Sequence, residues 1–290
     1  MPPKMEGKLN FKNSRMYVGV AWNQGGRPYM QDAFSLILNY EKDPCTDFLG
    51  VFDGHGPNGG PIARYVALNL FNVVMKKYLD QKQQLQEAIQ AGFSELDESM
   101  RTESSLMKSS GTAVLGGTTA LCIWVRHGIM YIAHVGDTRM VMSKKGVAYQ
   151  VTEDHKPSNN KEFQRIRNAR GFVCNDRVLG VLGVARAFAD YKYKANEDLP
   201  ADEQLITACP DLTMVGDENV DFIVLASDGV WDLMTNQEVV NFIRQRMEEL
   251  SPLQNICADL LKKCKLPIYT LTGIGQDNMT IIIGIFKDKN

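Results

Sequence analysis

The sequence predicts an α+β fold, in which antiparallel sheets are covered by helices. Two observations support this class: segments with the composition of β-strands come in clusters, and segments with helical periodicity come in pairs. The regular alternation of one strand and one helix that is typical of parallel sheets is not found. No linker-like segment, internal repeat or low-complexity tract divides the chain. We therefore expect one domain at residues 15–290, preceded by a loose N-terminal extension at residues 1–14.

The expected strands are short, bulky and apolar, and glycine or polar residues bound them. They are residues 17–22, 34–38, 48–52, 118–125, 130–135, 139–143, 147–151, 222–226 and 279–286. The expected helices carry apolar residues three and four positions apart. They are residues 62–79, 83–101, 159–170, 236–250 and 252–264. Residues 102–117 are expected to form a loop, and residues 171–205 an irregular excursion on the surface.

The composition is that of an ordinary globular protein, with 44% hydrophobic and 23% charged residues among 290. The net charge of −2 and the lack of a basic stripe argue against binding of nucleic acid. Phosphorylated protein substrates are not excluded, because a local cationic pocket does not show in the net charge. The six cysteines are scattered and no signal peptide is recognised, so we expect reduced thiols in a cytoplasmic or nuclear protein. No apolar run reaches the ~18 residues of a membrane span, and we expect a monomer.

Acidic residues recur at the ends of the apolar strands. Asp53, Asp137 and Asp228 each follow such a strand, and Asp277 lies just before the last one. Crowded carboxylates raise one another's pKa, and a divalent cation removes that cost. Ligands that are all oxygen suit Mg²⁺ or Mn²⁺, and four histidines without His-x-x-x-His spacing argue against zinc. The pattern therefore predicts a site for a hard cation.

Each of these aspartates, taken alone, could instead cap a helix or start a turn, and we assign Asp190 and Asp232 to such roles. The Asp53-Gly54 pair is also a strong hairpin signal. A hairpin requires a second strand at once, but residues 57–61 and a helical pattern follow here. His55 beside this corner makes a functional site the better interpretation.

The flanking residues strengthen that interpretation, because eight segments resemble motifs of the metal-dependent protein phosphatases of type 2C. They occur in the order and at about the spacing of that family, and the resemblance covers about residues 15–286. The segments are GGRPYMQDAF (25–34), FLGVFDGHG (48–56), GGTTA (116–120), AHVGDTR (133–139), TEDHKP (152–157), LGVARAFAD (182–190), VLASDGVWD (224–232) and GQDNMT (275–280).

The resemblance implies two packed antiparallel sheets with helical layers outside, a four-layer sandwich, and two Mn²⁺ or Mg²⁺ ions at one end. It implies that Asp53 bridges both ions, that the carbonyl of Gly54 ligates one of them, and that Asp228 and Asp277 complete the ligands of the first. Asp137 matches an acid that binds a weaker third ion. A water between the two ions would act as the nucleophile, without a phospho-enzyme.

Two further residues match family positions that handle the substrate. Arg27 matches an arginine that grips the phosphate, for which its planar guanidinium offers bidentate donors. His55 matches a proposed general acid, which a serine or threonine alkoxide needs in order to leave. An ordinary surface arginine and a turn histidine are the alternatives for these two residues.

The sequence departs from the family at a few positions. Many members carry glutamate where this chain has Gln31, so the second ion should bind more weakly, or Asp32 should take over part of the role. Ala185 and Ala189 replace a commoner serine and glycine in the flap beside the cleft. We expect these changes to affect substrate choice or loop mobility.

The sequence thus predicts a metal-dependent serine/threonine phosphatase that acts on phosphorylated proteins, with residues 15–290 as its catalytic domain. The first alternative is a catalytically inactive relative that only binds partners. The second is a two-metal nuclease or other phosphodiesterase, for which the missing basic stripe is unfavourable.

Overall fold

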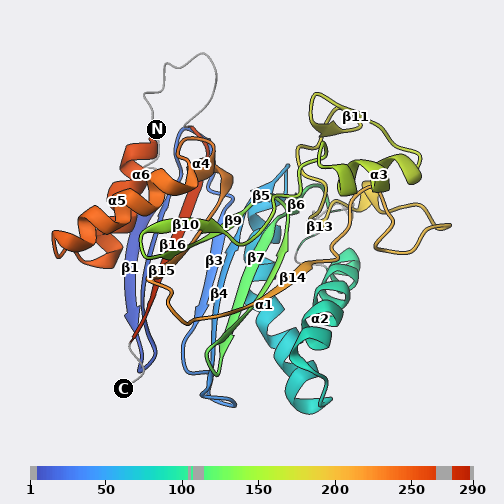
Figure 1. Cartoon of the computed structure of the whole chain (residues 1–290). Coiled ribbons are helices and arrows are strands. Elements are labelled where there is room, and N and C mark those ends of the chain that lie inside the picture. The colour runs from blue at the N-terminus through green and yellow to red at the C-terminus, as the bar shows by residue number, and fades with distance from the viewer. Residues whose placement is uncertain (1–4, 104–105, 107–113, 266–275, 288–290) are drawn as a thin grey trace.

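The computed structural model describes residues 5–103, 106, 114–265 and 276–287. Two antiparallel sheets form the centre of the molecule (Figure 1). The first sheet has, in spatial order, β1 (Glu6–Lys12), β2 (Met16–Asn23), β16 (Met279–Phe286), β15 (Phe222–Ala226), β9 (Arg139–Lys144) and β10 (Val147–Gln150). The second has β14 (Asp211–Gly216), β8 (Ile129–Val135), β7 (Ala120–Arg126), β4 (Thr46–Phe52) and β3 (Ala33–Ile37).

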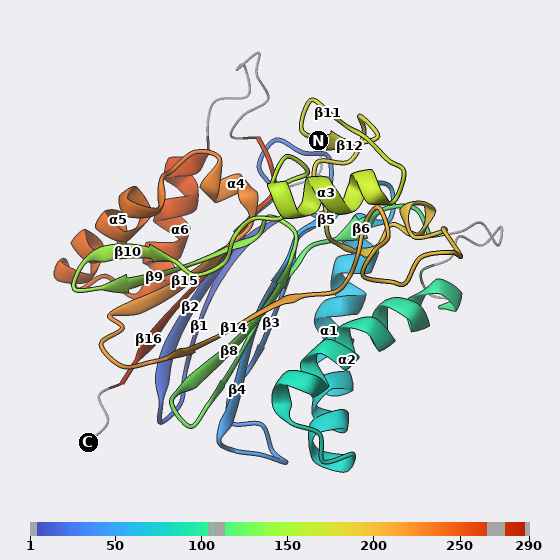
Figure 2. The ribbon, with the colours of Figure 1, turned by 45° about the vertical axis from the view of Figure 1, so that its right-hand side comes forward.

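Helices cover the outer face of each sheet (Figures 1 and 2). The second sheet packs against α1 (Gly59–Asp80) and α2 (Leu85–Ser99), and the first packs against α5 (Asn236–Glu248) and α6 (Leu253–Cys264). Two shorter helices, α3 (Asn160–Asn168) and α4 (Asp228–Trp231), lie near the upper end of the sheets in Figure 1. The predicted class, two packed antiparallel sheets between helical layers, is confirmed.

Strand β4 shows why a continuous apolar run forms a strand at the centre of this sandwich. All seven of its residues are buried. Phe48 and Phe52 pack among the core residues of α1 and α2, while Leu49 and Val51 pack between the two sheets. Successive side chains of a strand point to opposite faces, so a strand covered on both faces must be apolar throughout.

Three small strands beside the second sheet carry functional residues. They are β5 (Gly54–His55), β6 (Gly117–Thr118) and β13 (Phe188–Ala189), with β6 in the middle. A separate hairpin pairs β11 (Val173–Cys174) with β12 (Arg177–Val178). Residues 171–205 are otherwise largely irregular, as expected, apart from a short 3₁₀ turn at Tyr191–Tyr193.

The structure adds strands that the sequence analysis did not anticipate. Residues 6–12 of the predicted loose extension form β1, which pairs with β2 along its whole length. Both β1 and β14 are edge strands with mostly exposed or half-buried side chains, so they lack the apolar pattern used to find strands. The boundary between an extension at 1–14 and a catalytic domain at 15–290 stays a prediction. Most of the predicted loop at 102–117 lies outside the described residues.

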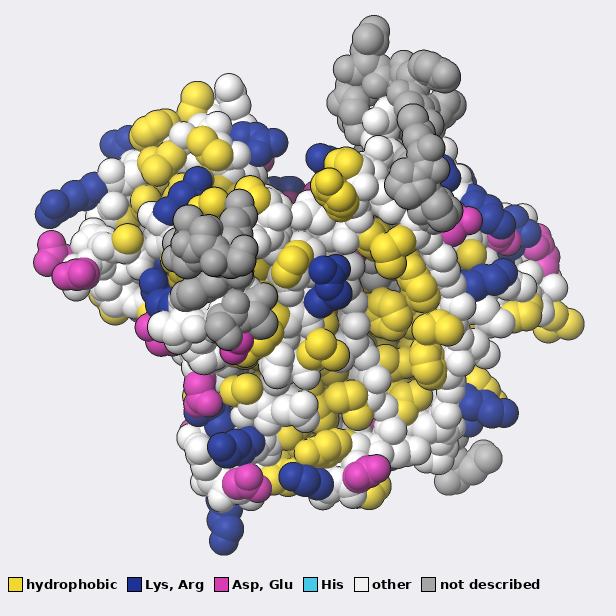
Figure 3. Space-filling view, turned by 180° about the vertical axis from the view of Figure 1, so that it is seen from behind, with side chains coloured by type: hydrophobic (Ala, Val, Ile, Leu, Met, Phe, Trp, Pro, Cys, Tyr) yellow, Lys and Arg dark blue, Asp and Glu magenta, His cyan; other side chains and the backbone are white. Residues whose placement is uncertain are grey.

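Apolar side chains also reach the surface on the back of the molecule, where many of them gather to the right of the centre in Figure 3. Leu9 and Phe11 of the edge strand β1 are among the exposed large apolar residues of the chain. Among the helices that the structure describes, none combines the length and the apolar character that crossing a membrane requires.

Candidate metal centre

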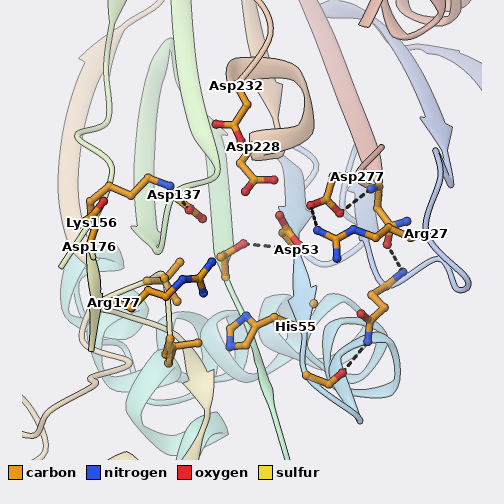
Figure 4. A pocket seen from close by; sticks show the side chains of 18 of the residues that line it. Arg27, Asp53, His55, Asp137, Lys156, Asp176, Arg177, Asp228, Asp232 and Asp277 are labelled. Atoms are coloured by element: carbon orange, nitrogen blue, oxygen red, sulfur yellow. Dashed lines mark hydrogen bonds and ion pairs between the residues drawn. The ribbon is translucent and has the colours of Figure 1, made fainter. Parts of the chain in front are cut away.

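A pocket of about 650 Å³ opens at one end of the two sheets, and most of the predicted site residues line it (Figure 4). Its lining includes Arg27, Gln31, Asp53, Gly54, His55, Thr119, Asp137, Lys156, Asp176, Arg177, Asp228, Asp232, Asp277 and Asn278. Residues far apart in the sequence therefore meet here, as the sequence predicted for the aspartates.

Asp53 enters the pocket because β4 ends at Phe52 and the chain turns at once into β5. Its backbone N–H donates to Oγ1 of Thr119 at 3.0 Å, which fixes the end of the strand. Glycine is required at the next position, since a Cβ on Gly54 would lie 2.4 Å from the carbonyl oxygen of Gly59. The close approach of these two backbones places the start of α1 directly beside the pocket.

Asp228 and Asp277 come from the other sheet. Asp228 is the first residue of α4, two residues after β15 ends, and Asp277 lies two residues before β16 begins. Strands β15 and β16 are antiparallel neighbours, so the end of one lies beside the start of the other. The pocket thus collects carboxylates from both sheets.

The carboxylates carry unfavourable electrostatics in this structure. Burial, and then repulsion from Asp32 and Asp228, raises the pKa of Asp53 well above its usual value. Burial, followed by repulsion from Asp137 and Asp277, does the same for the pKa of Asp228. Oδ1 of Asp228 is buried without a hydrogen-bond partner. A divalent cation would relieve both conditions, so these residues fit a hard ion.

Two cationic side chains neutralise part of this charge. Nη2 of Arg27 donates to Oδ2 of Asp277 at 2.5 Å, and Nζ of Lys156 donates to Oδ2 of Asp137 at 2.5 Å. Among the described residues, no three His, Cys, Asp or Glu side chains already converge closely enough to hold one ion. In this structure Asp277 and Asp137 are each paired with a basic side chain instead of with a cation.

The loop that carries Arg27 is held against the start of β16. The side chain of Asn278 accepts from the N–H of Gln31 at 2.7 Å and donates to the carbonyls of Gln24 and Tyr29. A Cβ on Gly25, whose φ is +63°, would lie 2.0 Å from the carbonyl oxygen of Asp277. Gly25 and Asn278 therefore allow the loop to bring Arg27 next to Asp277.

His55 has a partner that the sequence analysis did not identify. Its Nε2 lies 2.5 Å from Oδ2 of Asp190, which we had assigned to a turn. Asp232, assigned to a cap or turn, also lines the pocket, and burial raises its pKa. Asp232 follows Asp228 by four positions, one turn of helix, which is a spacing that could have indicated a shared face.

Asp32 and Gln31 occupy different positions around the centre. Asp32 is buried, accepts from Oγ of Ser227 at 2.9 Å, and is not among the side chains that line the pocket. Burial raises its pKa to about 7. Gln31 does line the pocket, and its Nε2 donates to the carbonyl of Gly56 at 2.8 Å. An ionised glutamate at this position could not donate that hydrogen bond.

Comparisons with known proteins agree with this geometry. A family model described as protein phosphatase 2C matches residues 16–268. The chain is 39% identical over 272 residues to a probable protein phosphatase 2C of Caenorhabditis elegans, covering 93% of this chain and 74% of that protein. It is 36% identical over 276 residues to protein phosphatase 2C homolog 2 of Schizosaccharomyces pombe, covering 93% and 73%.

The fold is shared with solved structures as well. A crystal structure of a phosphatase from Toxoplasma gondii superimposes with a TM-score of 0.78 at 21% identity, over 97% of this chain and 96% of that one. Together with the match to the family model over most of its length, this shows that the chain belongs to the protein phosphatase 2C family, the metal-dependent serine/threonine protein phosphatases.

Proposed function

We propose that Asp53, the carbonyl of Gly54, Asp228 and Asp277 hold two Mn²⁺ or Mg²⁺ ions, and that phosphoserine and phosphothreonine of proteins are hydrolysed in this pocket. The observation that carries the proposal is the meeting of carboxylates from both sheets, where crowding and burial raise the pKa of Asp53 and Asp228. When bound, the ions neutralise charge on the phosphate and activate a water molecule as the nucleophile.

Arg27 and His55 act on the substrate in this proposal. The side chain of Arg27 is 57% exposed at the pocket, so its guanidinium can turn from Asp277 to two phosphoryl oxygens. His55 gives a proton to the serine or threonine oxygen as the P–O bond breaks, because an unprotonated alkoxide is a poor leaving group. Water attacks phosphorus directly, and no phospho-enzyme forms.

A third ion would bind more weakly than the first two. Its proposed ligand, Asp137, is already paired with Lys156. Burial disfavours the charged form of Lys156, but the attraction to Asp137 outweighs this and raises the pKa of Lys156 above its usual value. The cation must displace this ammonium group. Asp32 is buried and does not line the pocket, so we propose that it is not a direct ligand and that it only adds to the negative charge that a cation would neutralise.

The alternative is a family member that binds partners without turnover. Gln31, a neutral residue where many members carry an acid, is the observation that favours it. Against it, Asp53, Asp228, Asp277, Arg27 and His55 all line one pocket. We further propose that the protein acts as a monomer in the cytoplasm or nucleus, which gel filtration and localisation of the tagged protein would test.

A metal titration with a phosphothreonine peptide tests the proposed function. We expect no turnover in EDTA, recovery with Mn²⁺ or Mg²⁺, and a loss of at least about 100-fold in Asp228→Asn. Asp198→Asn, a change at an exposed acid in the loop 194–205, is the matched control and should behave as wild type. Full activity in EDTA after dialysis, or wild-type turnover in Asp228→Asn, would refute the proposal. Hydrolysis of a diester in preference to the peptide would favour the phosphodiesterase alternative.

A further inference from the structure

The buried carboxylate of Asp190 contacts the ring of His55 from the other edge of the three-stranded sheet formed by β5, β6 and β13. Strand β6 pairs with β5 on one edge, which carries His55, and with β13 on the other edge, which ends one residue before Asp190. Asp190 is only 4% exposed, and its Oδ2 lies 2.5 Å from Nε2 of His55. An ionised carboxylate only accepts hydrogen bonds, so Nε2 must carry the hydrogen of this contact. Nδ1 is then the ring nitrogen left for the substrate.

The backbone that presents Asp190 is strained. Ala189 and Asp190 both have positive φ, +59° and +51°, a region that costs roughly 1–2 kcal/mol for an L-residue with a side chain. The N–H of Asp190 donates to the carbonyl of Gly116 at 2.9 Å. A Cβ on Gly117 would lie 2.4 Å from Oδ2 of Asp190. Gly117 thus makes room for the carboxylate. Strain of the kind seen at Ala189 and Asp190 persists only where the surroundings enforce it.

Asp97 of helix α2 holds this strained backbone in place through hydrogen bonds. Its Oδ1 accepts from the N–H of Ala189 at 2.6 Å, and its Oδ2 accepts from Nζ of Lys194 at 2.7 Å. Lys194 also donates to the carbonyl of Ala187, and the hydroxyl of Tyr191 donates to the carbonyl of Asp97 at 2.6 Å. A buried ion pair therefore clamps both sides of the strained turn that carries Asp190.

We propose that Asp190 is a positioning residue for His55, and that the pair of Asp97 and Lys194 keeps Asp190 in place; this rests on the proposed role of His55 as the general acid. Asp190 holds Nε2–H, so that Nδ1–H faces the leaving oxygen. In the step, water forms a new P–O bond and both of its hydrogens stay with the product phosphate, while the bond from phosphorus to the substrate oxygen breaks. The electron pair stays on that oxygen, the proton of Nδ1 moves to it, and a neutral imidazole remains hydrogen-bonded to Asp190.

The dependence on the leaving group tests this role. A phosphothreonine peptide releases an alkoxide that needs a proton, whereas p-nitrophenyl phosphate releases a stabilised phenolate that does not. In Asp190→Asn we expect kcat for the peptide to fall by roughly 10- to 100-fold with little change in KM, since positioned general acids contribute about 10²–10⁴-fold. The kcat for the aryl phosphate should stay within about twofold. His55→Ala is measured beside it, and Asp198→Asn is the control.

A double-mutant comparison of His55 and Asp190 distinguishes a positioning role of Asp190 from a general effect of Asp190 on the stability of the protein. We expect the double variant His55→Ala/Asp190→Asn to be no slower on the peptide than His55→Ala alone, because Asp190 acts only through the ring. Equal losses on both substrates, or multiplying losses in the double variant, would overturn the proposal. If His55→Ala itself turns over the peptide normally, the general-acid role fails as well, and that outcome is distinct from a failure of Asp190 alone.

A measurement on the wild-type protein covers the case in which Asp190→Asn does not fold. Nitrogen-15 NMR of the labelled, metal-free protein reports which ring nitrogen of His55 carries a proton. We expect a proton on Nε2, in either charge state of the ring. A neutral ring with its proton on Nδ1 alone would contradict the contact with Asp190 and overturn the proposal.

Discussion

Arg27 shows how one residue can serve both the free and the substrate-bound site. In this structure its guanidinium balances Asp277, which holds the pKa of the arginine above its ordinary value. The phosphate of the proposed substrate, like the carboxylate of Asp277, presents anionic oxygens that accept hydrogen bonds from a guanidinium. Exchange of one anion for another costs little desolvation, because the guanidinium is hydrogen-bonded in both states.

The first prediction concerns the shape of that cation. Arg27→Lys keeps the charge but loses the bidentate fork, so we expect KM for a phosphothreonine peptide to rise by roughly tenfold while kcat changes less. Steady-state kinetics at saturating Mn²⁺ measure both constants. Arg170→Lys, an exposed arginine after α3, serves as the control. An unchanged KM would remove Arg27 from the phosphate site.

The second prediction concerns Gln31. Gln31→Glu adds a charge to the lining of the pocket and loses the hydrogen bond to the carbonyl of Gly56. Because charge count strongly tunes the affinity of oxygen sites for divalent ions, we expect Mn²⁺ to bind about tenfold more tightly. Calorimetric titration of Mn²⁺ into the metal-free protein measures this without turnover. Weaker binding would show that the hydrogen bond to Gly56 matters more than the charge.

Sequence reasoning found the residues that end or begin apolar strands, because a burial pattern and a charged residue side by side are visible in one segment. Asp53, His55, Asp228 and Asp277 were found in this way and line the pocket, whereas Arg27 was found only through the resemblance to the phosphatase family. The partners of Asp137 and His55 were not found. Lys156 and Asp190 come from segments without periodicity, and their contacts depend on long-range pairings that a single sequence does not display.

At the scale of elements, the long helices, the central strands and the edge strands β3 and β10 could be predicted, whereas the edge strands β1 and β14 could not. The helix predicted at 236–250 is α5, for example, which begins at Asn236 and is capped by Thr235 in a complete capping box with Glu238. Strands β1 and β14 lie at sheet edges, where polar side chains are tolerated on exposed faces. The small strands β5, β6 and β13 have two residues each, too few for any period to show.

The third prediction belongs to the junction of β8, β14 and the loop before α3. The rings of His134 and His155 stack at 4.2 Å, and Nε2 of His155 lies 3.2 Å from Oδ2 of Asp211 in β14. Burial lowers the pKa of His134 to about 3, and burial lowers the pKa of His155 as well. In the unfolded chain both titrate near 6.5. The unfolded state therefore binds more protons below pH 6.5, and stability falls as the pH falls.

Denaturant unfolding between pH 6 and 4.5, compared between wild type and a histidine variant, measures this effect, because the raised pKa values of Asp32, Asp53 and Asp228 act in both proteins alike. Each histidine that stays neutral contributes a slope of up to about 1.4 kcal/mol per pH unit. We expect His134→Gln to lower the slope by about that amount, whatever its effect on stability at pH 7. His127→Asn, at an exposed turn, should leave the slope in this window closer to that of the wild type. An identical slope in His134→Gln would contradict the assignment.

At the scale of the whole molecule, the proposed ions would link two sheets whose shared core is apolar. The layer between the sheets consists of residues such as Val20, Leu121 and Ile282. Asp53 belongs to the second sheet, and Asp228 and Asp277 belong to the first. The raised pKa values of Asp53 and Asp228 oppose folding in the absence of a cation at neutral pH, so metal binding and folding must be linked.

Thermal unfolding with and without Mn²⁺ tests this linkage. An ion at about 100 times its Kd stabilises the folded state by about 2.7 kcal/mol, which corresponds to a rise in Tm of about 5 °C for a chain of this size. In Asp53→Asn one buried charge is gone, so the metal-free variant should unfold at a higher temperature than the metal-free wild type at pH 8, and Mn²⁺ should add little. Asp198→Asn should respond as wild type does. If Mn²⁺ raises the Tm of wild type and Asp53→Asn equally, the ion binds elsewhere and does not join the two sheets through Asp53.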